Sequence, residues 1–177
     1  MPVVSDSGPL IHLAQTNQIN LLKRIFGRVL IVLPVKREVV DEGIRGGYKD
    51  AKLVAETLAE GYIAIQRTGR QLTSRAVKLA KQENVSESDA QTLLLAKRLK
   101  GPLLTDDKVL SMLAKMYSLE VWNTWTILLE ALRKSLIEKS EIHRAINELG
   151  ERRHKLSPED AKQVLDAADR IAATKSS

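Results

Sequence analysis

The sequence predicts an α/β fold of three layers, with a central parallel sheet between two layers of helices and a helical extension at the carboxyl end. Short apolar runs alternate with longer segments whose apolar residues recur at helical spacing. Such alternation favours parallel strands that are covered by helices on both faces. The last three helical segments have no strand between them, and they predict the extension.

Five strands are expected, at residues 3–4, 29–33, 62–66, 102–105 and 120–122. Pro9 and Pro34 are each expected to begin a helix, because proline suits the first helical turn. Gly27 and Gly101 are expected to end helices. Further helical segments are predicted at residues 19–26, 48–59, 72–80, 86–99, 109–116, 125–132, 142–149 and 157–168.

The length of 177 residues is sufficient for one domain with a substantial core. We expect this domain to occupy residues 1–135 and the helical extension to occupy residues 136–177. The extension carries an apolar stripe at Ile142, Ala145, Ile146 and Leu149. Isolated helices of this length are marginal in water, so the stripe must pack on the core or pair in a homodimer.

Charge and composition favour a polyanionic partner. The formal net charge is +6, with 28 Lys and Arg against 22 Asp and Glu, and such an excess suits nucleic acid. Aromatic residues make up only 3% of the chain, so base stacking on aromatic platforms is not expected and backbone charge should dominate. The sequence has no cysteine, which excludes disulfides and thiolate metal sites.

No apolar run approaches the length that spans a membrane. The first residues also lack the basic and apolar regions of a secretory signal. These features predict a cytoplasmic protein that does not associate with membranes.

Four acidic residues lie where predicted strands end or neighbouring helices begin. Asp6 ends the first strand, and Asp107 follows the fourth. Asp89 lies in the first turn of the preceding helix, and Glu38 lies on the helix after the second strand. The carboxyl ends of parallel strands share one edge of a sheet, so these side chains are expected to converge. A carboxylate cluster requires a cation, and oxygen ligands select Mg²⁺ or Mn²⁺.

Helix capping is the alternative explanation for several of these acids. Asp is a common N-cap, and an acid at the third helical position completes a capping box. This explanation applies to Asp6, Asp89, Asp106 and Asp107, while Glu38 could be a solvated helix residue. The joint pattern favours a metal site that hydrolyses a phosphodiester beside a basic surface.

Other catalytic arrangements are not expected. His12, His143 and His154 are isolated and form no ligand pair at helical spacing. No glycine-rich loop ending in Gly-Lys is present, which argues against a nucleotide triphosphatase. A receiver domain with its own acidic pocket stays open as an alternative, but it explains Asp89 poorly.

Four motifs together resemble the PIN-domain ribonucleases. They are Val4-Ser5-Asp6-Ser7-Gly8-Pro9-Leu10, Arg37-Glu38-Val39-Val40, Glu87-Ser88-Asp89-Ala90 and Leu103-Leu104-Thr105-Asp106-Asp107. The likeness covers about Met1 to Ser135 and is closest to a prokaryotic PIN-like branch of unknown function, related to VapC-type toxins. It implies a PIN-like nuclease domain at residues 1–135.

The resemblance also implies roles for individual residues. Asp6, Glu38, Asp89 and Asp107 match the catalytic acids, and metal binding is assigned to Asp6, Asp89 and Asp107. Ser7, Thr105, Asp106 and Glu87 are the supporting residues.

The implied activity is Mg²⁺- or Mn²⁺-dependent endonucleolytic cleavage of single-stranded RNA. Relatives of this kind are often homodimers, and toxin members are blocked by an antitoxin protein. Lys36 and Arg37, beside Glu38, are the best candidates for contacts with RNA phosphates. The alternative is a catalytically weak PIN-like scaffold that binds RNA or a protein partner.

Overall fold

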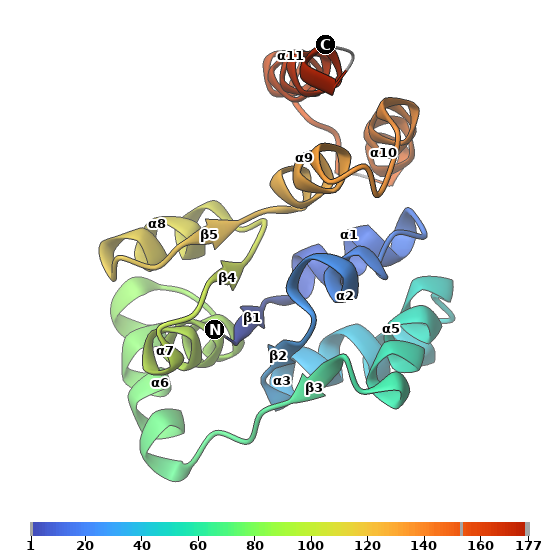
Figure 1. Cartoon of the computed structure of the whole chain (residues 1–177). Coiled ribbons are helices and arrows are strands. Elements are labelled where there is room, and N and C mark those ends of the chain that lie inside the picture. Colours follow the sequence, from blue (N-terminus) through green and yellow to red (C-terminus); the bar gives the residue numbers. More distant parts are fainter. Residues whose placement is uncertain (1, 153, 176–177) are drawn as a thin grey trace.

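The centre of the structure, a computed structural model that describes residues 2–152 and 154–175, is a five-stranded parallel sheet (Figure 1). The strands are β1 (Val3–Ser5), β2 (Val29–Ile31), β3 (Ile63–Ile65), β4 (Leu103–Leu104) and β5 (Val121–Trp122). The helices are α1 (Ser7–Gln15), α2 (Leu21–Phe26), α3 (Leu33–Lys36), η1 (Arg37–Glu42), α4 (Gly43–Arg45), α5 (Lys49–Glu60), α6 (Arg70–Glu83), α7 (Glu87–Leu99), α8 (Lys108–Met116), α9 (Thr124–Arg133), α10 (Lys139–Glu151) and α11 (Pro158–Lys175). Within the described residues, no helix combines the length and apolarity needed to cross a membrane.

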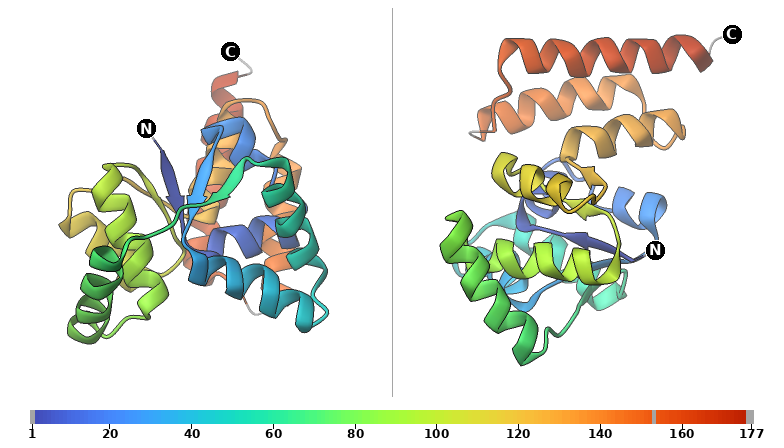
Figure 2. Two further views of the ribbon diagram at one scale, coloured as in Figure 1. Left: turned by 90° about the horizontal axis from the view of Figure 1, so that it is seen from below. Right: turned by 90° about the vertical axis from the view of Figure 1, so that its left-hand side faces the viewer.

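The strand order is β3-β2-β1-β4-β5, and every neighbouring pair is parallel. The chain moves outward from β1 to β3 and then returns to add β4 and β5 on the other side of β1. Because parallel crossovers are right-handed, this reversal places the two sets of connecting helices on opposite faces. Figure 2 shows α6 to α8 on one side of the strands and α1 to α5 on the other. The predicted three-layer α/β/α fold is confirmed.

The close approach of β4 to β1 depends on Gly101. The residue before it, Lys100, ends α7 in the left-handed conformation with φ of 52°, a role that the sequence suggests for the glycine. Gly101 is needed for space instead, because a Cβ there would lie 1.9 Å from the carbonyl oxygen of Pro2. Glycine at this position therefore lets the two central strands lie side by side.

The helix expected to begin at Pro34 is divided into α3, η1 and α4. The middle segment, η1, is π-helical. Val39 and Val40 in this segment are buried, and Glu38 is exposed. π-Helical turns are rare and are frequent at functional sites.

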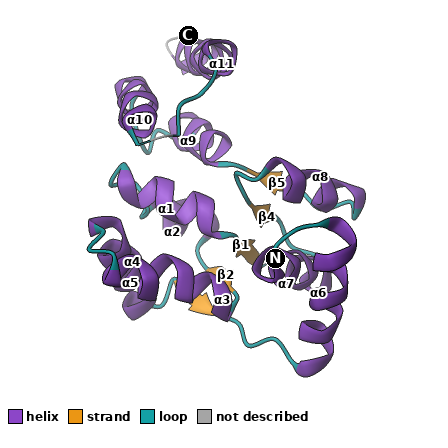
Figure 3. Cartoon of the chain, turned by 180° about the vertical axis from the view of Figure 1, so that it is seen from behind, coloured by secondary structure: helices purple, strands orange, loops and turns teal. Residues whose placement is uncertain are grey.

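Helices α9, α10 and α11 stack beyond the sheet, on the side of α1 (Figures 1 and 3). Ile142, Ala145 and Ala168 are buried and belong to the same apolar cluster as the strands. The sequence leaves two alternatives for the apolar stripe, packing on the core or pairing in a homodimer. In the structure the stripe packs on the core of the same chain.

We expect Ile142→Ala to lower the free energy of unfolding by about 2–5 kcal/mol, the usual cost of truncating a buried isoleucine. The Ile142 side chain is 0% exposed. Ile146, one helical turn later, is only partly buried, so Ile146→Ala should cost clearly less. Urea unfolding of the full-length variants measures both effects, and equal losses would contradict the packing of α10 on the core.

Candidate functional site

The reversal in strand order lies between β1 and β4, and both strands end in polar residues. Ser5 and Leu104 are partners in the sheet register, so the residues that follow them, Asp6 and Thr105, emerge together. In open α/β sheets, ligands bind in the crevice at the carboxyl ends of the strands where the order reverses. The fold therefore brings the first and last predicted motifs to this crevice.

Asp6 is the most buried acid of this crevice, with 6% of its surface exposed. Its Oδ1 accepts hydrogen bonds from the Ser7 backbone N–H at 2.7 Å and from the Ser7 hydroxyl at 3.3 Å. Its Oδ2 accepts one from the Thr105 hydroxyl at 3.2 Å. The carboxylate thus caps α1 and also connects β1 to the end of β4.

Burial, followed by repulsion from Asp89, raises the pKa of Asp6 from 3.8 to about 6. Glu38 adds a smaller repulsion, while the hydrogen bonds from Ser7 and Thr105 act in the opposite direction. Asp6, Asp89 and Glu38, which come from three separate elements, are therefore close enough to repel one another.

Glu38 reaches this group from the π-helical segment η1. Partial burial raises the pKa of Glu38, interaction with the Ser7 side chain lowers it, and repulsion from Asp89 and Glu42 raises it again. The net shift is upward. Ser7 therefore lies between the carboxylates of Asp6 and Glu38 and contributes to both.

Asp89 belongs to the acidic group and to a helix cap at once. Its Oδ2 accepts from the Ser86 backbone N–H at 3.3 Å, and its own N–H donates to the Ser86 hydroxyl at 3.0 Å. This reciprocal pair is the capping box that the sequence suggests as an alternative explanation. Capping and electrostatic contact with Asp6 are compatible, because α7 begins beside the carboxyl edge of the sheet.

Asp107 is connected to the group through Thr105. The Asp107 backbone N–H donates to the Thr105 hydroxyl at 3.1 Å, and that hydroxyl donates to Asp6. The Asp107 carboxylate is exposed and caps α8, accepting from the Leu110 N–H at 2.7 Å. In this structure its side chain therefore stabilises a helix start next to the acidic group.

Asp106 faces a different set of partners. It accepts from the backbone N–H of Thr124 at 2.8 Å and from its hydroxyl at 2.6 Å, and its Oδ2 lies 2.6 Å from Nδ1 of His12. Burial raises the pKa of Asp106, but the contacts with His12 and Thr124 outweigh it and hold the pKa below its usual value. Gly8 leaves room for this arrangement, since a Cβ there would lie 3.3 Å from the Asp106 side chain.

His12 is a site residue that sequence reasoning missed. It is 4% exposed, and the ring of His154 lies edge-on against it. Both contacts join residues that are distant in the sequence, so no local motif could reveal them. The one available signal is the position of His12 on the buried face of α1, one turn after Gly8.

The remaining predicted residues lie around the rim. Lys36 forms an ion pair with Asp41, and its Nζ lies 2.6 Å from Oδ1 of Asp41. Arg37 and Glu87 are exposed, at the starts of η1 and α7. Of these three, Arg37 is the basic residue that remains accessible beside Glu38.

The donor set fits a hard cation such as Mg²⁺ or Mn²⁺. Its ligands are all oxygen atoms, and the raised pKa values of Asp6 and Glu38 indicate negative charge in need of neutralisation. Among residues 2–152 and 154–175, however, no group of three or more His, Asp or Glu side chains is arranged to hold a metal ion. A cation here would use one or two carboxylates together with water, as Mg²⁺ commonly does.

The parallel sheet has acidic side chains at the point where its strand order reverses. This arrangement is typical of α/β proteins that bind ligands at the carboxyl edge of the sheet. The chain belongs to the PIN-domain family DUF3368, whose model matches residues 2–170. The resemblance seen in the sequence is confirmed, and the match continues past Ser135 to include α10 and most of α11. PIN domains are generally nucleases, which supports a hydrolase.

The fold is also found among solved structures. One of them is the crystal structure of PAE2754 from Pyrobaculum aerophilum, with a TM-score of 0.53 and 15% sequence identity. The alignment covers 73% of this chain and 97% of that one. The low identity limits this likeness to the fold. A comparison with curated proteins finds no match.

Asp6→Asn should stabilise the metal-free protein at neutral pH, by up to about 3 kcal/mol for a pKa raised by roughly two units. Between pH about 4 and about 6 the folded wild type binds more protons than the unfolded chain, so its stability falls as the pH rises. Asparagine still accepts a hydrogen bond from Ser7, and it has no charge to titrate. Urea unfolding in EDTA across this pH range should show the fall in the wild type and a flatter profile in the variant.

Asp106→Asn is the matched control. The pKa of Asp106 is lowered, whereas that of Asp6 is raised. The stability that ionised Asp106 contributes is present at neutral pH and is lost as the pH falls through its lowered pKa. This variant should therefore be destabilised at pH 7, by about 1–3 kcal/mol for a buried, hydrogen-bonded carboxylate. Destabilisation of both variants at pH 7 would contradict the unfavourable burial and repulsion assigned to ionised Asp6.

Proposed function

We propose that this protein is a Mg²⁺- or Mn²⁺-dependent endonuclease that cuts single-stranded RNA. The observation that supports this most is the buried Asp6 carboxylate, which lies at the switch point of the sheet beside Asp89 and Glu38. Buried carboxylates that repel one another are costly unless a cation balances them. The nuclease character of PIN domains supports the same reaction class.

The residues divide into distinct roles. Asp6 and Asp89 would hold the cation, which when bound activates water and stabilises the leaving oxygen. Asp107 would act through water, because its carboxylate caps α8. Glu38 is exposed and has a raised pKa, so it is suited to accept a proton from the attacking water.

Positive charge on the surface supports an RNA substrate. Arg37 is exposed beside Glu38. A separate cleft of about 370 Å³, toward the end of α7 away from Asp89, has only basic side chains among its charged lining residues, namely Arg75, Lys97 and Arg98. Such side chains bind phosphates without reading sequence. Because Asp6 is recessed, a flexible single strand can approach it more easily than a rigid duplex.

A toxin role, with a homodimer and an antitoxin protein that blocks the site, belongs to the same proposal. Its support is the resemblance to toxin-related PIN domains and the exposed apolar face of α8, where Val109 and Met116 are 44% and 74% exposed. Exposed apolar side chains that lie close together often mark a protein interface. An adjacent reading frame of antitoxin size would support the role.

A catalytically weak PIN-like scaffold is the second candidate. In the described ranges no set of three acidic or histidine side chains is ready to hold a metal ion, and this observation favours it. Several single-stranded RNAs that bind the protein yet stay intact with Mn²⁺ would support the scaffold and contradict the nuclease.

Asp89→Asn should abolish RNA cleavage in Mn²⁺ while changing the free energy of unfolding by at most about 1 kcal/mol. Asparagine keeps an acceptor for the Ser86 N–H but removes the charge that a divalent ion needs. Ser86→Ala is the matched variant: it removes the hydroxyl that caps α7 and should cost about 1 kcal/mol while cleavage survives.

Melting temperature in EDTA and cleavage of a labelled single-stranded RNA measure the two effects. An EDTA reaction excludes metal-independent contamination. If Asp89→Asn cuts as well as the wild type, Asp89 is only a cap, and Glu87 becomes the next acid to test.

A further inference from the structure

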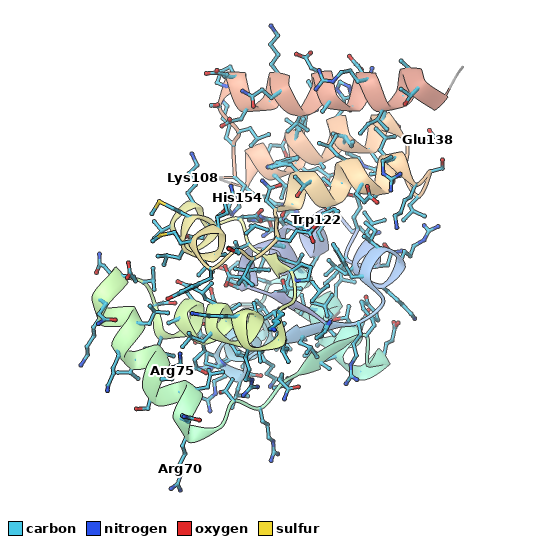
Figure 4. The ribbon with its side chains drawn as sticks, turned by 60° about the vertical axis from the view of Figure 1, so that its left-hand side comes forward. Arg70, Arg75, Lys108, Trp122, Glu138 and His154 are labelled. Atoms are coloured by element: carbon cyan, nitrogen blue, oxygen red, sulfur yellow. The ribbon has the colours of Figure 1, made fainter. Side chains whose placement is uncertain are left out.

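A cleft of about 870 Å³ lies beside the acidic group. Its walls come from α8, from β5 and α9, and from the α10–α11 connection with the start of α11. Lys108 lines it on the side of α8 and His154 on the side of that connection; both are labelled in Figure 4. A cleft of this size is suited to a ligand as large as one or two nucleotides.

The cleft adjoins the proposed catalytic centre. Thr105 and Asp107 form part of its lining, and the Thr105 hydroxyl donates to Asp6. A strand with a phosphate at Asp6 would therefore have its next nucleotide at the mouth of this cleft.

Trp125 offers the cleft an aromatic surface on a rigid support. Thr124, the residue before it, is held by two hydrogen bonds to Asp106. Asn123 and Thr126 form a reciprocal capping box with N–H donors at 2.8 Å on both sides. The Trp125 side chain is partly buried against the core and lines the cleft, so its orientation is fixed before a ligand arrives.

Lysines supply the charge for phosphates. Lys108, Lys115 and Lys155 line the cleft, and within the described part of the chain none of them forms an ion pair. Of the acids in the lining, Asp106 is already paired with His12, which leaves Asp160 on the opposite wall and Asp107 at the mouth.

We propose that this cleft binds the nucleotide next to the scissile phosphate, with its base stacked on Trp125 and its phosphate near Lys108 and Lys115. The inference rests on the proposed function, since the catalytic centre defines which phosphate is cut. Asn123 also lines the cleft. Its Oδ1 is used by the Thr126 N–H, so its amide N–H₂ can donate to a base carbonyl. Aromatic residues make up only 3% of the chain, and one of them, Trp125, lines this cleft.

The two tryptophans make a direct test possible. Trp122 belongs to β5 and is not part of the cleft lining; its Nε1 donates to Glu120 at 2.8 Å and its ring contacts Phe26 edge-on. Trp122→Phe leaves Trp125 as the single tryptophan, Trp125→Phe leaves Trp122, and excitation at the red edge of the absorption band avoids the tyrosines. Both proteins are titrated in EDTA with a short single-stranded RNA, so that binding is measured without cleavage.

The emission of Trp125 should be strongly quenched as RNA saturates, and that of Trp122 should stay nearly constant. Trp125→Ala should weaken RNA binding by about tenfold or more, whereas Trp125→Phe should retain most of the affinity, because phenylalanine also stacks. Unchanged Trp125 emission at RNA concentrations that saturate binding would overturn the proposal and leave the cleft to a peptide.

Charge variants keep the test independent of any folding defect in Trp125→Ala. Lys108→Ala and Lys115→Ala should each lower the slope of log affinity against log salt by about 0.7, the value for one phosphate contact on a single strand. Lys162→Ala, at an exposed position on α11, is the control and should leave the slope unchanged. Equal slopes in all four proteins would contradict the cleft as a phosphate site.

The outcomes separate this inference from the nuclease itself. Quenching of Trp125 without any cleavage in Mn²⁺ would support the nucleotide site and overturn the enzyme. Cleavage that persists in Trp125→Ala with unchanged affinity would support the enzyme and overturn the nucleotide site.

Discussion

A carboxylate that is nearly inaccessible to water lies at the carboxyl end of the central strand, beside two others. Asp6 occupies this position because β1 has neighbours on both sides and its chain turns directly into α1. Hydrogen bonds from Ser7 and Thr105 reduce the cost of burying the charge, yet the pKa of Asp6 stays about 6. A bound cation would offset the remaining electrostatic cost of the ionised carboxylate. The proposed chemistry depends on this cation.

Asp106 and Asp107, the two acids that follow β4, connect the acidic group around Asp6 to different helices. Asp107 fixes the start of α8, while Asp106 holds Thr124 at the start of α9 and contacts His12 on α1. Helix α9 in turn carries the packing of α10 and α11. The carboxyl-terminal helices are thereby connected to the carboxyl edge of the sheet and form one wall of the cleft beside it. The family match through residue 170 is in agreement with this continuity.

Local patterns were sufficient to predict the strands, the parallel sheet and the positions of Asp6 and Asp107 at strand ends. They could not predict features that depend on contacts between distant segments. The π-helical turn of η1 is one such feature, and helical periodicity in the sequence does not report it. Likewise, Asp106 and Asp107 are equivalent in the sequence, and only the neighbouring His12 and Thr124 give the first of them a different role. The sequence predicts the capping box at Asp89 as an alternative to metal binding, and in the structure Asp89 both caps α7 and repels Asp6.

The most direct test of the account is a crystal structure of the full chain with Mn²⁺, using anomalous scattering to locate the metal. We expect an anomalous peak in the crevice between β1 and β4, with carboxylate oxygens of Asp6 and Asp89 about 2.0–2.3 Å from the ion and water completing its coordination. Binding at this point would show that the repulsion among these carboxylates is balanced by a cation. Mn²⁺ bound elsewhere, or carboxylates of Asp6 and Asp89 directed to separate surfaces at saturating metal, would contradict the account.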